Sequence, residues 1–114
     1  MPNAVSVLTL ATLTAISSYT SGAKTVTGAL TLIVVDLHVT ACTGAGILQI
    51  NRVGLGGDAT IYPMKSMVIQ PGARDYVLAV STYALHAIFD SVQVDIINNG
   101  GLSLTGTIVA TGRL

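Results

Sequence analysis

Apolar residues recur at every second position in short runs along this chain, and this spacing limits which folds it can adopt. Val92, Val94 and Ile96 alternate with polar residues, which places three aliphatic side chains on one face of an extended strand. Val, Ile and Thr are abundant, and no stretch repeats apolar residues at helical spacing between capping residues. The chain is therefore predicted to be all-β.

Short segments with this pattern are separated by turn residues throughout the chain. The predicted strands are Ala4–Leu10, Leu30–Ala41, Ile47–Val53, Ala59–Met64, Met67–Ile69, Asp75–Val80, Ser91–Ile97 and Leu102–Ala110. A length of 114 residues suits one domain. About eight short antiparallel strands with turns between them predict a single domain, 1–114, folded as a two-sheet sandwich like a jelly roll.

Four features of the sequence allow more specific predictions about individual strands and turns. The segment Leu30–Ala41 is apolar on both faces, so it is expected to be a central strand or to face a neighbouring subunit. Pro63 lacks a backbone donor, which predicts an edge strand or a break there. The segment Asn98–Gly101 predicts a hairpin between its flanking strands, and Gln70–Ala73 predicts a type II turn.

Charge is unusually scarce for a domain of this size. The chain has five acidic residues, all Asp, and five basic residues, and it is 51% hydrophobic and 9% charged, where about a quarter charged is usual. We infer that further copies of the chain cover much of its surface. A net charge of zero without a basic stripe argues against a nucleic-acid partner, and apolar runs shorter than about 18 residues argue against a membrane span.

The uncharged segment 1–23 and the lone cysteine bear on where the chain is made. The segment could be mistaken for an export signal, but it lacks a basic start and is diluted by Ser and Thr, so no signal peptide is expected. Cys42 is the only cysteine, so no disulfide can form within the chain. Both features are consistent with synthesis in a cytoplasm.

No pattern of residues specifies a reaction. Asp36, His38 and Cys42 share a parity that would place them on one face of a regular strand, but a zinc site needs three or four ligands and the only other histidine is His86. There is no Gly-x-Ser-x-Gly motif, phosphate-binding loop or local carboxylate pair. We predict that the chain is not an enzyme and has no catalytic, cofactor-binding or metal-binding residues.

Some charged and aromatic residues are candidates for contacts between subunits. Arg74 and Asp75 adjoin at a strand start and Arg113 lies beside the final residue; each could pair across an interface, or be a solvated charge of little energetic weight. The aromatic residues nearby are expected to be core or interface anchors. The predicted interface set is Arg74, Asp75, Tyr76, Tyr83, Phe89 and Arg113.

The order of several segments resembles small virion proteins of tailed bacteriophages, of the capsid decoration (cement) or head-fibre type. The similar segments are Val35–Gly44, Leu48–Ile50, Gly72–Leu78, Ser91–Ile96 and Asn99–Leu104. The resemblance implies a non-enzymatic jelly-roll protein, made in the host cytoplasm and located in the virion. It further implies a homotrimer or other oligomer that binds the major capsid protein and supports the shell.

Two alternatives remain at this point. The chain could be a carbohydrate- or receptor-binding module of a phage tail or fibre, for which Tyr62, Tyr83, Asn98 and Asn99 are the candidate residues. It could also be a small β-barrel enzyme that uses His38 or His86, which the residues favour least.

Overall fold

The computed structural model describes residues 5–25, 32–53, 60–81 and 91–113. The regular elements among these residues are all strands. In chain order they are β1 (Val5–Ile16), β2 (Tyr19–Thr20), β3 (Lys24–Thr25), β4 (Leu32–Thr43), β5 (Gly46–Val53), β6 (Ile61–Ile69), β7 (Arg74–Ser81), β8 (Ser91–Asn98) and β9 (Ser103–Arg113).

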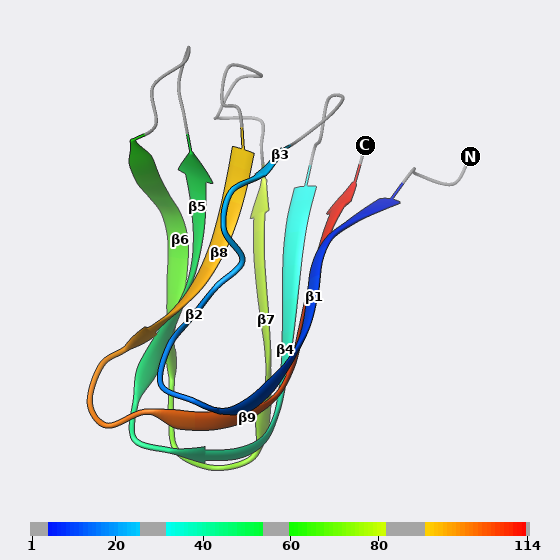
Figure 1. Ribbon diagram of the computed structural model, residues 1–114. Coiled ribbons are helices and arrows are strands. Elements are labelled where there is room, and N and C mark those ends of the chain that lie inside the picture. The colour runs from blue at the N-terminus through cyan, green and yellow to red at the C-terminus, as the bar shows by residue number, and fades with distance from the viewer. Residues whose placement is uncertain (1–4, 26–31, 54–59, 82–90, 114) are drawn as a thin grey trace.

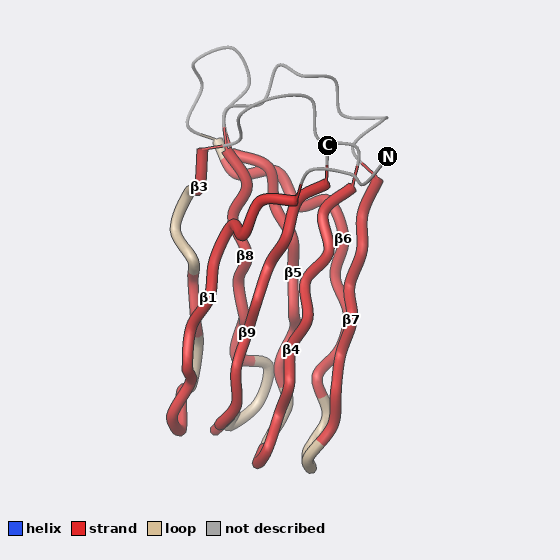
Figure 2. Tube along the Cα trace, turned by 90° about the vertical axis from the view of Figure 1, so that its right-hand side faces the viewer, coloured by secondary structure: helices blue, strands red, loops and turns tan. Residues whose placement is uncertain are grey.

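The strands form two antiparallel sheets that pack face to face (Figure 1, Figure 2). The β4 sheet has the strand order β1-β9-β4-β7, and the β5 sheet has the order β2-β8-β5-β6, with β3 also paired to β8. β2 and β3 together form one edge of the β5 sheet, which we call the β2–β3 row. Ser21 between them also bonds to β8: its backbone N–H donates to the Val94 carbonyl at 2.9 Å, and its Oγ accepts from the Val94 N–H at 2.9 Å.

This strand order is that of a jelly roll. β5 and β6 pair directly, whereas the connections on either side of them pass to the facing sheet. Each sheet therefore interleaves strands from distant parts of the chain, as two Greek keys do. The predicted all-β, two-sheet jelly-roll sandwich is confirmed.

The core consists of the aliphatic side chains between the two sheets. On β4 the buried residues are Ile33, Val35, Leu37 and Val39, at every second position, because alternate side chains of a strand point to opposite faces. β4 lies between β9 and β7, which confirms that the segment apolar on both faces is a central strand. Cys42 near the end of β4 and Leu102 just before β9 also belong to the core. The core residues of the other strands are Leu13, Leu48, Ile50, Ile69, Tyr76, Leu78, Val92, Val94, Ile96, Leu104, Ile108 and Ala110.

The hairpin predicted at Asn98–Gly101 is wrong, because β8 and β9 belong to facing sheets. The turn itself is real: Asn98 Oδ1 accepts from the backbone N–H of Gly100 at 3.0 Å and of Leu102 at 3.2 Å. Val94 and Leu104 are both buried in the shared core. Apolar and polar residues alternate in the same way in two strands that pair within one sheet and in two strands that face each other across the core. The alternation therefore could not show which arrangement β8 and β9 adopt.

The short strands β2 and β3 were not predicted, and most predicted bounds differ by one to three residues from those of the structure. Two segments differ more. β1 runs to Ile16 rather than Leu10, because its Thr residues favour a strand as much as its aliphatic residues do. The two strands predicted within 59–69 form one strand, β6. Pro63 lies on the edge of the β5 sheet, next to a slip in register between Ile50 and Asn51, which confirms the edge prediction.

At one end of the sandwich, two connections pack backbone to backbone. The N–H of Ala45 donates to the carbonyl of Gly100 at 3.1 Å, and the N–H of Asn99 donates to the carbonyl of Ala45 at 2.9 Å. Gly44 has a φ of 75°, and a Cβ there would lie 2.2 Å from the carbonyl oxygen of Gly101. Gly101 has a similar φ of 65°, but a Cβ there would have open space. Gly44 is thus required for both conformation and close approach.

We predict that Gly44→Ala destabilises the fold more than Gly101→Ala. The control replacement should cost about 1–2 kcal/mol for a left-handed backbone, whereas Gly44→Ala should lose at least about 1 kcal/mol more, because its new methyl group separates the two connections. Urea unfolding at one fixed protein concentration measures both. Equal losses would show that the connections do not depend on their close contact.

Candidate functional site

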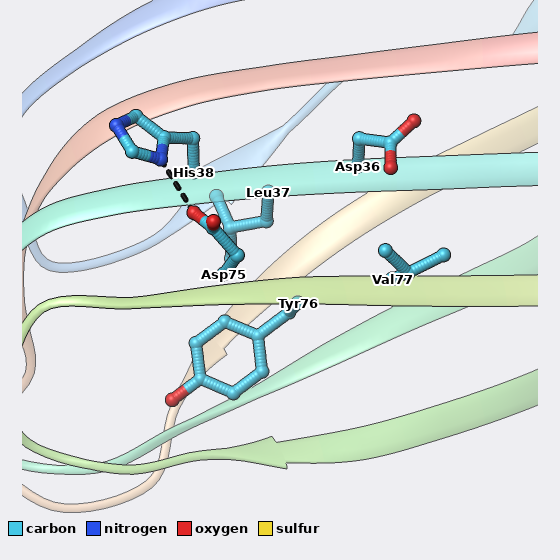
Figure 3. Close-up of a pocket in the computed structure, with 6 residues that line it drawn as sticks. All are labelled: Asp36, Leu37, His38, Asp75, Tyr76 and Val77. Atoms are coloured by element: carbon cyan, nitrogen blue, oxygen red, sulfur yellow. Dashed lines mark hydrogen bonds and ion pairs between the residues drawn. The ribbon is translucent and has the colours of Figure 1, made fainter.

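A pocket with three polar side chains lies on the outer face of the β4 sheet. The register places His38 of β4 opposite Asp75 of β7, and the His38 Nδ1 contacts the Asp75 Oδ1 (Figure 3). Asp36 lies two residues before His38 on the same face. The pocket measures about 240 Å³ and is lined by Asp36, Leu37, His38, Asp75, Tyr76 and Val77.

The chemistry available in this pocket is limited by its exposure. The side chains of His38 and Asp75 are 63% and 74% exposed, so water screens their interaction and it contributes little to stability. A carboxylate beside an imidazole can orient the ring. Within the described ranges, no group of three or more His, Cys, Asp or Glu side chains is arranged to hold a metal ion. The pocket is therefore open to water, with the His38–Asp75 pair at its surface.

Cys42 does not share a face with Asp36 and His38, as it would if β4 were regular throughout. The pairing of β4 with β9 slips between Val39 and Ala41, and such a slip reverses the face on which later side chains lie. Cys42 consequently points into the core and is 7% exposed, while Asp36 and His38 are exposed on the outer face. Burial raises the pKa of the Cys42 thiol.

A second polar group lies on the outer face of the β5 sheet and was not singled out from the sequence. Asn51 is completely buried there. Its Oδ1 accepts from Gln49 Nε2 at 2.7 Å, and its Nδ2 donates to Asp95 Oδ2 at 2.8 Å and to the Gln93 carbonyl at 3.4 Å. Gln93 Nε2 in turn donates to both Asp95 carboxylate oxygens, at 3.0 and 3.1 Å. The network connects β5 to β8 and satisfies the buried amide.

A sequence signal for this network did exist. Gln49 and Asn51 are spaced by two residues, and so are Gln93 and Asp95. Amide and carboxyl groups at that spacing point to one face of each strand. What the sequence lacks is the pairing of β5 with β8, which places Asn51 opposite Gln93 and Gln49 opposite Asp95.

Apolar side chains surround this polar network on the same outer face. Ile97, Ile47 and Val68 form one row across β8, β5 and β6, and Val68 and Ile97 are 57% and 39% exposed. Ile61, at the other end of β6, is also exposed. We call Ile47, Val68 and Ile97 the apolar row. Exposed aliphatic groups beside a satisfied polar network are typical of a protein contact surface.

The residues predicted to form an interface lie in different surroundings. Arg74 is exposed and its Nη1 donates to Gln70 Oε1 at 3.1 Å, while Asp75 contacts His38. Tyr76 is 5% exposed, and its hydroxyl accepts from the Gln70 N–H and donates to the Gln70 carbonyl. Tyr76 therefore anchors the turn before β7, so any contribution to an interface would come through its neighbours.

Other predicted residues fall outside what the structure describes. Tyr83, Phe89 and His86 lie in the segment 82–90, and for Arg113 the structure describes the backbone pairing with Leu32 and Val5. The interface role of the predicted set remains a prediction.

The candidate residues for carbohydrate binding are not brought together where they are described. Tyr62 pairs with Arg52 at one end of the β5 sheet, and Asn98 pairs with Gly46 at the other end. The Arg52 guanidinium stacks on the Tyr62 ring, 4.8 Å from its centroid. Asn98 uses its side-chain oxygen to hold its own turn. These two residues do not share a binding site.

We predict that Cys42 reacts with iodoacetamide much more slowly in the folded chain than in urea. Burial hinders access to its sulfur and keeps the thiol protonated, whereas the thiolate is the reactive form. Mass spectrometry after timed alkylation at mildly alkaline pH measures the rate. Similar rates in the folded and unfolded chain would contradict the inward orientation of Cys42.

We also predict that Asn51→Asp destabilises the fold by about 1–3 kcal/mol at neutral pH, because it places a second carboxylate against Asp95 and loses a donor. The folded variant should retain a proton that the unfolded chain releases, so its deficit relative to wild type should shrink as the pH falls toward about 4. Asn99→Asp is the control, because it makes the same replacement at an exposed position in the connection between β8 and β9, away from Asp95. Urea unfolding at both pH values tests this; a deficit independent of pH would contradict it.

Comparison with known proteins shows the fold and no closer kinship. No protein-family model and no curated protein matches the sequence. No helix in the described part of the chain is long and apolar enough to cross a membrane.

Solved structures similar to this chain include the PBSX exported protein XepA. The TM-score is 0.62 at 12% identity, covering 96% of this chain and 36% of XepA, so the chain spans about a third of that protein. Two weaker similarities have TM-scores below 0.5. A protein of the disulfide-linked pili on Bacillus endospores has a TM-score of 0.47 and 19% identity, covering 99% of this chain and 89% of that chain. The Tobacco streak virus coat protein has a TM-score of 0.46 and 10% identity, covering 99% of this chain and 88% of that chain. The chain thus shares a β-sandwich fold with part of XepA.

Proposed function

We propose that this chain is a structural protein that assembles with copies of itself and with a larger particle. More specifically, we propose that it is a decoration (cement) protein on the capsid of a tailed bacteriophage, where it binds the major capsid protein and supports the shell. In this proposal it catalyses no reaction and needs no cofactor. The homotrimer is the oligomer implied by the resemblance of its sequence to such proteins.

The observation that carries the proposal is the apolar row on the outer face of the β5 sheet. Val68 and Ile97 expose aliphatic surface that the chain's own core does not use, and Val77 on the opposite face of the sandwich is 60% exposed. Larger contiguous apolar patches, of more than a few hundred Å², are uncommon on soluble monomers and mark contact sites. A contact surface buried against a partner removes this cost.

The scarce charges support the same proposal. Those that the structure describes in contact with neighbours include Arg74 with Gln70 and Asp95 with Asn51. The Nζ of Lys65 donates to the carbonyl of Ala79 at 3.1 Å. The formal net charge of zero leaves little net repulsion between neighbouring copies. An exterior that is poor in charge and rich in threonine is suited to close packing in an assembly.

The jelly-roll fold is compatible with a virion protein but does not by itself imply one. This architecture occurs in viral capsid proteins as well as in lectins and enzymes. Support for the phage assignment comes from the segments that resemble phage virion proteins. The part of the proposal that concerns the capsid exterior therefore depends on finding the chain on particles.

The experiment uses particles from the organism that encodes this chain. Purified particles are analysed by mass spectrometry and by imaging with a label directed at the chain, and stripped particles are then mixed with purified chain. Copies arranged on the outside of the shell would support the proposal. Particles free of the chain, or a wild-type chain that stays monomeric at high micromolar concentration, would contradict it.

We predict that the double variant Val68→Asp, Ile97→Asp binds stripped particles at least about tenfold more weakly than the wild type. A tenfold change in the dissociation constant corresponds to about 1.4 kcal/mol, and burial of one aliphatic side chain contributes about that much or more. The double variant Ser103→Asp, Thr107→Asp on β9 of the other sheet is the control, because both positions are exposed and the two replacements add the same charge. Co-sedimentation measures binding. Equal binding by the double variant would show that the apolar row does not contact the shell.

A further inference from the structure

The four edges of the two sheets differ in how far they are protected from pairing with another strand. An exposed edge presents unpaired N–H and C=O groups that can accept a strand from another chain. Proteins commonly block such edges with Lys, Pro, bulges or very short strands. The edge strands here are β1 and β7 of the β4 sheet, and β6 and the β2–β3 row of the β5 sheet.

Three of these edges carry blocking features. β6 contains Pro63, a slip in register beside it and the exposed Lys65. Lys65 also reaches across to β7, where its Nζ donates to the Ala79 carbonyl, so one lysine occupies both edges on that side. The β2–β3 row consists of two-residue strands separated at Gly22, which has a φ of 66°.

β1 has much weaker protection. It is 12 residues long, and its sequence contains no charged residue and no proline. It pairs with β9 on one side, and no strand in the described ranges pairs with its other side. Its slips in register lie between Val7 and Thr9 and between Leu13 and Ile16. The segment Thr9–Leu13 between them pairs regularly and is as long as a typical strand of about five residues.

We propose that the Thr9–Leu13 segment of β1 pairs antiparallel with the same segment of a second copy of this chain. Like charges directly opposite each other destabilise strand pairing, and this segment has none. Pairing of β1 with a different edge of a second copy is opposed by the blocking features of β6, β7 and β2–β3. β1 against β1 has two-fold symmetry, and the contact closes because each copy uses the same edge.

The joined structure extends one sheet through both copies. Two β4 sheets would become one continuous sheet with β1 at its centre. The outer face at the junction carries Thr12, which is exposed and lies opposite Thr107 of β9. Backbone hydrogen bonds would supply the contact without requiring charged side chains. This inference rests on the proposed self-assembly and specifies one contact of it, which has two-fold rather than three-fold symmetry.

The test compares two lysine substitutions on one sheet face. Thr12→Lys adds a charge to the edge strand, which opposes strand addition and sets two like charges near each other across the two-fold axis. Thr107→Lys adds the same charge one strand inward, where it leaves the β1 edge open but would disturb stacking of the sheet face. Sedimentation equilibrium of the full-length chain measures the dissociation constant, and circular dichroism confirms that each variant is folded.

We predict that wild type forms a dimer, that Thr12→Lys raises its dissociation constant at least about tenfold, and that Thr107→Lys changes it little. Hydrogen exchange of the wild-type chain provides a second readout that needs no variant: amides of Thr9–Leu13 should be more protected in concentrated than in dilute samples.

Every other outcome contradicts the edge contact or the proposed assembly. A wild-type oligomer that Thr12→Lys leaves intact, or β1 amides that exchange equally at both concentrations, would overturn the edge contact while leaving self-assembly in place. Dissociation by Thr107→Lys alone would indicate stacking of sheet faces instead. A wild-type chain that is monomeric throughout would overturn both the edge contact and the proposed assembly.

Discussion

Packing of two sheets through their aliphatic inner faces is the interaction on which the rest of this structure depends. Residues such as Val35 and Leu37 on β4 and Leu48 and Val94 on the β5 sheet are buried almost completely. Burial of such side chains is the main favourable contribution to folding. Because every strand has to present its apolar residues to this one layer, the faces of the strands, and hence the positions of all outer polar groups, follow from it.

The composition of the outer surfaces depends on which residues are not buried in the core. With few charges in the chain, its outer faces carry Thr, amide and aliphatic groups, gathered into the apolar row, the Asn51 network and the His38–Asp75 pair. Within the described residues, every buried side-chain nitrogen and oxygen has a hydrogen-bond partner. Such surfaces are suited to contacts between proteins. Because the sheet edges are protected to different degrees, pairing with another strand is favoured at the least protected edge.

Sequence reasoning succeeded where local pattern determines structure and failed where distant strands meet. The period of two identified the inward residues of β8, and Pro63 correctly marked an edge; for β4, apolar on both faces, only the structure shows which face is buried. The same period could not show that β8 and β9 belong to facing sheets, nor that a slip after Val39 turns Cys42 into the core. Part of the candidate site was accessible in the same way: Asp36 and His38 share a face as predicted, whereas the contact of His38 with Asp75 required the register of β4 against β7.

The amino-acid sequence by itself determined that the chain is all-β, that its strands have one apolar face, and that its exterior is poor in charge, because these properties depend on residue type and spacing along the chain. The tertiary structure alone decided the strand order, the burial of Asn51 beneath Gln49, Gln93 and Asp95, and the openness of the β1 edge. These features depend on which strands become neighbours, and in a jelly roll neighbouring strands come from distant parts of the chain.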